Sequence, residues 1–264
     1  MLEVKNAVFG YTGKQNKKTV LEQVSFSLKE GELLCILGAN GVGKTTMYRT
    51  ILGFLPVLGG EIVIDGQDTR QMPREKLSKL ISYVPQYHTP PFAYSVKDVV
   101  LMGRGTHISR FASPGKEDER IVCEMMERMG VLHLADRFYT ELSGGERQLV
   151  LIARALAQQT RHILMDEPAA NLDFGNQMRL LGEIRKLTAE GIGVCFTTHY
   201  PDHAFLAKAS VLALEGRDTW TCGSAEDVLT EERLKRMYGI PVMLNTYADQ
   251  HGNPMKQITA QIGL

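Results

Sequence analysis

The 264-residue sequence has no long apolar stretch and no net charge. No run approaches the about 18 apolar residues of a membrane-spanning helix, so we expect no segment that crosses a bilayer. The first thirteen residues lack a basic segment followed by an apolar one, so we expect no secretory signal. Thirty basic residues balance thirty acidic ones, and without a strong field of one sign we expect no nucleic-acid partner.

Cysteines are also few, and none of the four forms a C-x-x-C pair. Cys35 and Cys195 lie inside apolar, strand-like runs, where a free thiol behaves as a small hydrophobic side chain. Cys123 and Cys222 are equally isolated along the chain. The spacing favours reduced cytosolic thiols over disulfides, in a chain long enough for one large domain or two small ones.

A phosphate-binding loop is the most informative feature that is present. An apolar run over 33–37 predicts a buried strand, and the spacing Gly38-x-x-x-x-Gly43-Lys44-Thr45 follows it at the start of a helical pattern. Glycines let backbone N–H groups surround an anion, and the positive end of the helix dipole adds to the attraction. Lys44 is expected to reach the β- and γ-phosphates and the Thr45 hydroxyl to bind Mg²⁺. The alternative is an ordinary glycine-rich turn between a strand and a helix.

A second helix start also offers free backbone N–H groups. Ser143, Gly144 and Gly145 precede a predicted helix, and Ser143 with Glu146 has the spacing of a capping box. Capping alone would explain Ser143 and Glu146. One chain would then have two anion-binding helix starts for one nucleotide. A symmetric dimer explains this, because each chain would close over the nucleotide bound by its neighbour.

An acidic pair follows the apolar strand predicted over 162–165. Parallel α/β sheets place ligands at the carboxyl ends of their strands. There, Asp166 can hold Mg²⁺ through water, and Glu167 can orient or deprotonate a water that attacks the γ-phosphate. The alternative for a lone Asp-Glu pair is an acidic turn.

Three more residues lie at predicted strand ends or in loops. His199 follows the strand predicted over 193–198, where it could donate a hydrogen bond to a phosphate oxygen. Tyr11 ends the first predicted strand, and its ring could stack on a purine or simply pack against the protein. Gln86 lies in a proline-rich loop, and its position alone gives it no role.

The order of predicted elements indicates an α/β fold. The expected strands are 2–9, 20–28, 61–64, 80–84, 162–165, 193–198 and a last one at 211–214, and the expected helices are 45–54, one capped by Ser95, 116–129, 149–157, 175–189 and two short ones in 225–238. The first two strands form an antiparallel pair. Helical patterns lie between strands, so we predict a helical subdomain, at about 86–160, inserted into the nucleotide-binding core.

With these motifs in place, the chain resembles the ATP-binding subunit of an ABC transporter over about 2–240. Five motifs occur in the family's order, and Glu146 replaces a common glutamine. The resemblance implies one ABC ATPase domain over 1–240. This domain would contain a P-loop NTPase (RecA-like) core with a mostly parallel sheet, and an antiparallel β subdomain. Residues 241–264 are expected to form a C-terminal tail.

The resemblance also implies roles for residues at the matching positions. It implies catalytic roles for Lys44, Gln86, Glu167 and His199; Mg²⁺ binding by Thr45, Gln86 and Asp166; and ATP contacts by Tyr11, Gly38, Ala39, Asn40, Gly41, Val42, Gly43, Lys44, Thr45, Thr46, Ser143, Gly144, Gly145 and Asp173. In the family, the serine-glycine signature contacts the γ-phosphate bound by the other protomer. The glutamine at the Gln86 position also senses the membrane partner.

A subfamily signal lies in residues 90–104, which are similar to the ATPases of importers for iron-siderophore, haem and cobalamin. Continued through 105–108, the stretch is most similar to the molybdate/tungstate members of that group. This implies a homodimeric ATPase on the cytoplasmic face of the inner or plasma membrane. Its partners would be permease subunits and, indirectly, a periplasmic or lipoprotein substrate-binding protein. An exporter ATPase and a soluble, non-transport ABC ATPase remain as alternatives.

Overall fold

The computed structural model of the chain describes residues 1–13, 17–86, 92–109, 112–248, 252 and 254–261. Its largest sheet has the order β10-β9-β3-β8-β7-β6. The strands are β3 (Leu33–Gly38), β6 (Ile81–Val84), β7 (His162–Met165), β8 (Gly193–Thr198), β9 (Ser210–Leu214) and β10 (Trp220–Ser224). All neighbouring strands are parallel except β10, which pairs antiparallel with β9. The mostly parallel core sheet is thus confirmed.

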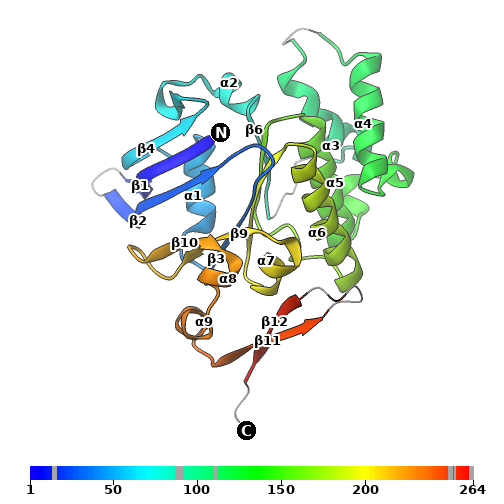
Figure 1. Cartoon of the computed structure of the whole chain (residues 1–264). Helices are drawn as coiled ribbons and strands as arrows, with labels where there is room; N and C mark the ends of the chain where they lie inside the picture. Colours follow the sequence, from blue (N-terminus) through cyan, green and yellow to red (C-terminus); the bar gives the residue numbers. More distant parts are fainter. Residues whose placement is uncertain (14–16, 87–91, 110–111, 249–251, 253, 262–264) are drawn as a thin grey trace.

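An antiparallel sheet of order β2-β1-β4-β5 lies on one side of this core (Figure 1). Its strands are β1 (Leu2–Thr12), β2 (Lys17–Leu28), β4 (Gly59–Ile64) and β5 (Gln67–Asp68). The predicted antiparallel pairing of the first two strands is confirmed, and both strands run longer than their alternating patterns indicated.

The strands of the core sheet are buried on both faces, as parallel strands usually are. Along β3, Cys35 and Leu37 belong to the apolar core that includes α5 and α6, whereas Ile36 points into the opposite core with Met47 and Tyr48 of α1. All five side chains are fully buried. The alternation places one apolar core on each face and fixes β3, with the loop that follows it, between them.

Helices cover the sheet and form a separate cluster on the other side of the molecule (Figure 1). They are α1 (Lys44–Ile51), α2 (Arg74–Ser78), α3 (Val96–Leu101), α4 (Lys116–Arg128), α5 (Gly144–Ala157), α6 (Phe174–Ala189), α7 (Asp202–Ala207), α8 (Ala225–Val228) and α9 (Glu231–Tyr238), with 3-10 turns η1 (Thr69–Gln71), η2 (Met102–Thr106), η3 (Leu132–Leu134) and η4 (Tyr139–Glu141). Helices α3, α4 and α5 pack against one another. The predicted cap of α3 is confirmed, because Ser95 forms a capping box with Asp98. No helix in the described part of the chain has the length and apolar character needed to cross a bilayer.

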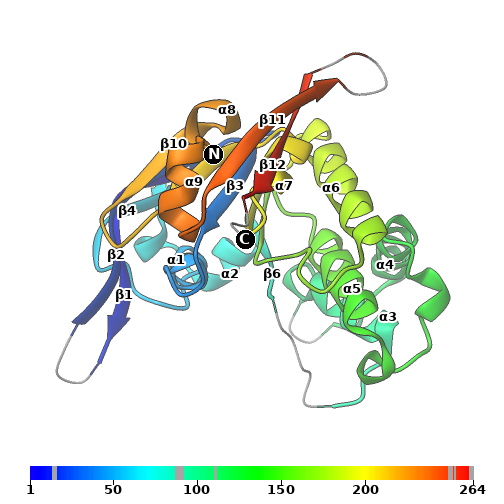
Figure 2. The ribbon, with the colours of Figure 1, turned by 90° about the horizontal axis from the view of Figure 1, so that it is seen from below.

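The C-terminal region contains structure that the sequence did not predict. The strand at 211–214 was expected to be the last, and this was wrong, because β10, β11 (Val242–Ala248) and β12 (Pro254–Ala260) follow it. The last two form a hairpin beside α7 and α9 (Figures 1 and 2). The N–H of Ile258 donates to Asp202 Oδ1 at 2.8 Å, and the N–H of Leu244 donates to Glu231 Oε1 at 2.8 Å.

Four adjacent strands, β3, β8, β7 and β6, end at the same edge of the core sheet. The phosphate loop follows β3, His199 follows β8, the acidic pair follows β7, and Gln86 comes two residues after β6. Residues 87–91, including Pro90 and Pro91 of the subfamily stretch, lie outside the described residues. The fold therefore gathers motifs that are far apart in sequence at one edge of the sheet.

Candidate nucleotide site

The phosphate loop turns sharply between β3 and α1. Gly43 has φ +122°, and a Cβ added there would lie 2.7 Å from Val20 Cγ1, so the position accepts only glycine without rearrangement. The Lys44 side chain is 6% exposed, and its ammonium donates to the Gly38 carbonyl at 2.7 Å. Lys44 Nζ also lies 3.6 Å from Glu167 Oε1. The loop thus presents one buried cation beside a carboxylate.

Asp166 is buried and held by hydroxyl groups. Its Oδ2 accepts from Thr45 Oγ1 at 2.7 Å, and its Oδ1 accepts from Thr197 Oγ1 at 2.7 Å. Tyr83 OH lies 3.4 Å from the same Oδ2. Burial, and then the charge of Asp166, raises the pKa of Tyr83. A hydroxyl beside a carboxylate is the oxygen chemistry that Mg²⁺ prefers, so Thr45 and Asp166 fit that ion.

Glu167 joins three of the predicted motifs. Its Oε2 accepts from Gln86 Nε2 at 2.7 Å and lies 3.4 Å from His199 Nδ1, and its Oε1 faces Lys44. Its backbone has φ +47°, and its N–H donates to Thr197 Oγ1 at 2.8 Å. A non-glycine residue in this conformation is strained, and such strain is common at functional sites.

A cavity of about 660 Å³ opens over the phosphate loop. Its lining residues come from β1, β2, the loop, α1 and the ends of β6 and β7: Tyr11, Lys18, Thr19, Val20, Asn40, Gly41, Gly43, Lys44, Thr45, Thr46, Gln86 and Glu167. The Tyr11 ring is 40% exposed, and its hydroxyl lies 2.8 Å from Thr46 Oγ1. The structure therefore brings the predicted aromatic residue, the phosphate loop, Gln86 and Glu167 to one cavity.

Other predicted residues do not line this cavity. Ser143 caps α5, accepting from the Glu146 N–H at 3.3 Å, while its own N–H donates to Glu146 Oε2 at 2.8 Å. Asp173 caps α6, and the Asn176 N–H at 2.9 Å holds the pKa of Asp173 below its usual value. Gly144 and Gly145 lie beside Asn171 and Leu172 of the loop before α6. Within the described part of one chain, the serine-glycine segment and Asp173 are not among the residues that line the cavity over the phosphate loop.

Sequence reasoning missed several residues of the site. Thr197 and Tyr83 hold Asp166, and neither occupies a motif position. Their contacts arise because β6 and β8 are the neighbours of β7, which sequence spacing does not reveal. Thr19 and Val20 line the cavity from β2.

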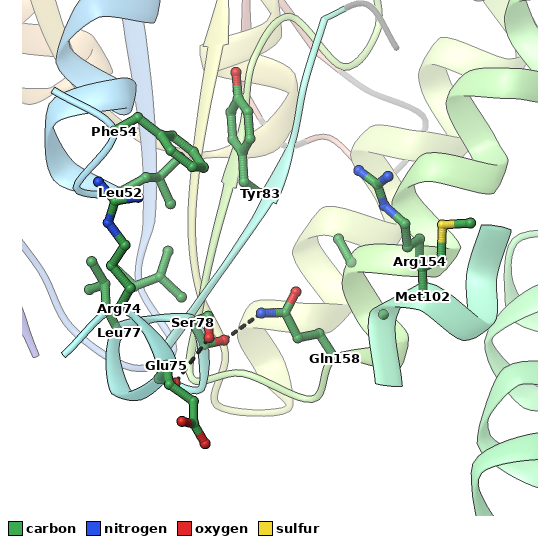
Figure 3. Close-up of a pocket in the computed structure, with 13 residues that line it drawn as sticks. Leu52, Phe54, Arg74, Glu75, Leu77, Ser78, Tyr83, Met102, Arg154 and Gln158 are labelled. Carbon is green, nitrogen blue, oxygen red and sulfur yellow. Dashed lines mark hydrogen bonds between the residues drawn. The ribbon is translucent and has the colours of Figure 1, made fainter. Parts of the chain in front are cut away.

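A second hollow, of about 460 Å³, lies between the core and the helical cluster (Figure 3). Phe54 and Tyr83 stand on one side of this groove, and Arg154 and Met102 stand on the other. Phe54 is 62% exposed. At the floor, Gln158 Nε2 donates to the Ser78 carbonyl and so ties α5 to the C-terminal end of α2. Tyr83 borders the groove and also contacts Asp166, so one side chain reaches from the groove to the acidic pair.

The comparisons with known proteins agree with this geometry. The ABC transporter family profile matches residues 21–170, more than half of the chain. The molybdate import ATP-binding protein MolC of Haemophilus influenzae is 37% identical over 242 residues, covering 91% of this chain and 89% of that protein. An inward-facing structure described as a metal-chelate type ABC transporter has a TM-score of 0.85 and 34% identity, covering 99% of this chain and 97% of that one. A dimeric bacterial ABC transporter cassette has a TM-score of 0.73 and 28% identity, covering 84% of this chain and 98% of that one. The chain therefore belongs to the ABC transporter family, as an ATP-binding subunit with ATPase chemistry.

Proposed function

We propose that this subunit powers the import of a metal chelate, such as an iron-siderophore, haem or cobalamin, or of molybdate or tungstate. The observation that carries the proposal is the single cavity that joins a phosphate loop to Glu167, with Gln86 and His199 on the same carboxylate. The similarity to a molybdate import subunit and to a metal-chelate type transporter supports the choice of cargo.

The described side chains support a division of chemical work. Lys44 binds the β- and γ-phosphates as a point charge, and Tyr11 stacks on the adenine. Glu167 orients the attacking water and accepts its proton, while Gln86 holds the carboxylate by a hydrogen bond and the His199 ring faces it from another side. Thr45 and Asp166, with Gln86, would hold Mg²⁺, which when bound neutralises charge on the phosphate oxygens.

A homodimer completes the site in this proposal. The serine-glycine segment at the start of α5 offers backbone N–H groups to an anion, yet it lies away from the phosphate loop of its own chain. A second copy can bring its Ser143, Gly144 and Gly145, together with Asp173, to the nucleotide of the first. The match to a dimeric cassette supports this arrangement.

The groove of Figure 3 is the proposed contact with the permease. Exposed Phe54 and Met102 give it an apolar rim, and Met102 lies in the stretch that resembles the importer subfamily. The subunit would then lie on the cytoplasmic face of the membrane and meet a substrate-binding protein only through the permease.

Two measurements test the proposal. Affinity purification of the full chain from membranes is expected to bring down a polytopic membrane protein, and Phe54→Asp is expected to weaken that association. A deletion strain is expected to lose uptake of one cargo when tested with iron chelates, haem, cobalamin and molybdate. The proposal of import would be contradicted if the chain were purified without any membrane protein. It would also be contradicted if the deletion strain lost efflux and kept uptake.

A further inference from the structure

The segment just after β8 contains a network beside His199 that no sequence motif explains, and its two ends, Thr198 and His203, are buried. Thr198, the last residue of β8, is 4% exposed, and His203 on α7 is also 4% exposed. Thr198 Oγ1 lies 3.1 Å from His203 Nδ1 and accepts from the Tyr200 N–H at 3.1 Å. The His203 N–H in turn donates to the Tyr200 carbonyl at 3.1 Å. These bonds close residues 198–203 into one turn.

Ring contacts extend the network to the nucleotide site. The Tyr200 ring centroid lies 5.3 Å from that of His203 and 4.2 Å from that of His199. His199 Nδ1 then lies 3.4 Å from Glu167 Oε2. The rings of His203, Tyr200 and His199 thus form a continuous series that ends at the carboxylate.

A buried ring nitrogen is costly unless it has a polar partner, and Thr198 supplies one for His203. Burial, and then the charge of His199, lowers the pKa of His203 to about 4, which keeps its ring neutral near pH 7. Neutral His203 adds no charge beside His199. Its contribution is therefore geometric.

We propose that His203 is a positioning residue, which fixes the rotamer of His199 against Glu167 through Thr198 and Tyr200. This inference rests on the proposed function of His199 in ATP hydrolysis. Without the Thr198–His203 bond, the turn over 198–203 loses the only one of its three hydrogen bonds described above that involves the His203 ring, and His199 leaves its position beside the carboxylate for part of the time. Positioning errors of about 1 Å can cost on the order of a hundredfold in rate.

The test compares two substitutions of His203 in the full chain. His203→Phe keeps an aromatic ring but removes the nitrogen, whereas His203→Asn keeps a polar atom near the place of Nδ1. We expect His203→Phe to lower kcat for ATP hydrolysis by at least about tenfold. We expect the Kd for a fluorescent ATP analogue to stay within about twofold, because the phosphate loop is untouched. His203→Asn should retain most of the activity.

Thr198→Val removes the other end of the bond with almost no change in volume, and it gives a result even if His203→Phe folds poorly. We expect at least as large a fall in kcat, because valine also removes the acceptor of the Tyr200 N–H. Adding His203→Phe to Thr198→Val should cause no further fall, because the contact between the two side chains is already broken. The positioning role would be overturned if Thr198→Val kept the wild-type kcat. It would also be overturned if His203→Phe lost kcat and ATP affinity equally, or if His203→Asn were no more active than His203→Phe.

His199→Ala separates this inference from the function on which it rests. If His199→Ala hydrolyses ATP at the wild-type rate, the proposed role of His199 itself is wrong. If His199→Ala is inactive while His203→Phe and Thr198→Val are fully active, only the positioning role of His203 is wrong.

Discussion

Glu167 is the residue on which the site geometry converges. Gln86, His199 and Lys44 reach its carboxylate from three separate strand ends, and its own backbone is held in a left-handed conformation by Thr197. Strain of this kind persists only where the surroundings fix it. The arrangement fits a carboxylate that must point in one direction toward the γ-phosphate.

Replacing Glu167 by glutamine tests its role as the base. Glutamine keeps the shape but cannot accept the proton of the attacking water, so we expect turnover to fall by at least about a hundredfold. ATP binding should persist, since the phosphate loop is unchanged. Release of phosphate and titration with a fluorescent ATP analogue measure the two effects, and near-normal turnover would remove the role from this residue.

Lys44→Ala is expected to act on binding. It removes the only buried cation among the described residues that line the cavity, and such charged hydrogen bonds contribute about 1.5–3 kcal/mol. The Kd for ATP should rise by on the order of ten- to a hundredfold in a nucleotide titration. Lys18→Ala is the matched control, because Lys18 lines the same cavity but is exposed, and its effect should be smaller.

At this scale, sequence spacing predicted the residues whose chemistry depends on local backbone. The phosphate loop is one continuous turn, and Asp166 and Glu167 directly follow an apolar strand. Thr197 and Tyr83 could not be found in this way, because their contacts with Asp166 depend on which strands are neighbours.

At the scale of elements, the start of α5 has two possible uses. Ser143 caps the helix through its capping box with Glu146, which is sufficient to explain both side chains. The proposed function gives the same residue a second task, contact with the phosphate bound by the partner. The two roles can be separated by a substitution that keeps the helix cap and removes the contact with phosphate.

Ser143→Asp is that substitution. Aspartate is as good an N-cap as serine, but it places a second carboxylate beside Glu146, so the free energy of unfolding should fall by no more than about 1 kcal/mol. Its negative charge should repel a phosphate, so ATP hydrolysis should be lost. Ser143→Ala provides the converse control, since loss of the cap costs about 1 kcal/mol. Full activity in Ser143→Asp would leave the residue with the capping role alone.

The amino end of β7 makes stability depend on pH. His162 is fully buried, and burial followed by the positive charge of the N-terminus lowers its pKa to about 4. The unfolded chain takes up this proton near pH 6.5 while the folded chain does not, so stability falls as the pH drops from about 6.5 to about 4. Of the loss in unfolding free energy between pH 7 and pH 5, His162 should account for about 2 kcal/mol.

His162→Phe tests this assignment, since it keeps a buried ring that cannot titrate. Urea unfolding at pH 7 and pH 5 should show a smaller pH dependence in the variant by that amount. An unchanged pH dependence would place the effect on other groups, such as His203, whose pKa is also lowered to about 4.

Prediction of elements succeeded for the longer elements with a clear apolar pattern and failed for short or exposed ones. Strands β3, β6, β7, β8 and β9 give apolar runs and the longer helices give apolar stripes, so these were found. Helices α2 and α7, of five and six residues, were not predicted, although α7 is largely buried. Strand β10 has no buried residue and the β11–β12 hairpin has one, so they have little apolar periodicity to detect. They are held by backbone pairing and by contacts with α7, α8 and α9.

At the scale of the whole molecule, the proposed function needs a link between the groove and the nucleotide site. Tyr83 borders the groove proposed for the permease and also contacts Asp166 in the nucleotide site. ATP can shift a conformational equilibrium only if it binds one state more tightly than the other. The proposed dimer, closed over two nucleotides, would provide such a difference, because the contacts from Ser143 would form only in the closed state.

The most direct test of this claim is the mass of the Glu167→Gln protein in solution with MgATP, measured by sedimentation. We predict a dimer with two bound nucleotides, and a monomer when ATP is withheld or when Ser143→Asp is added. A Glu167→Gln protein that binds ATP fully yet stays monomeric, or a dimer that Ser143→Asp does not weaken, would contradict the shared nucleotide site.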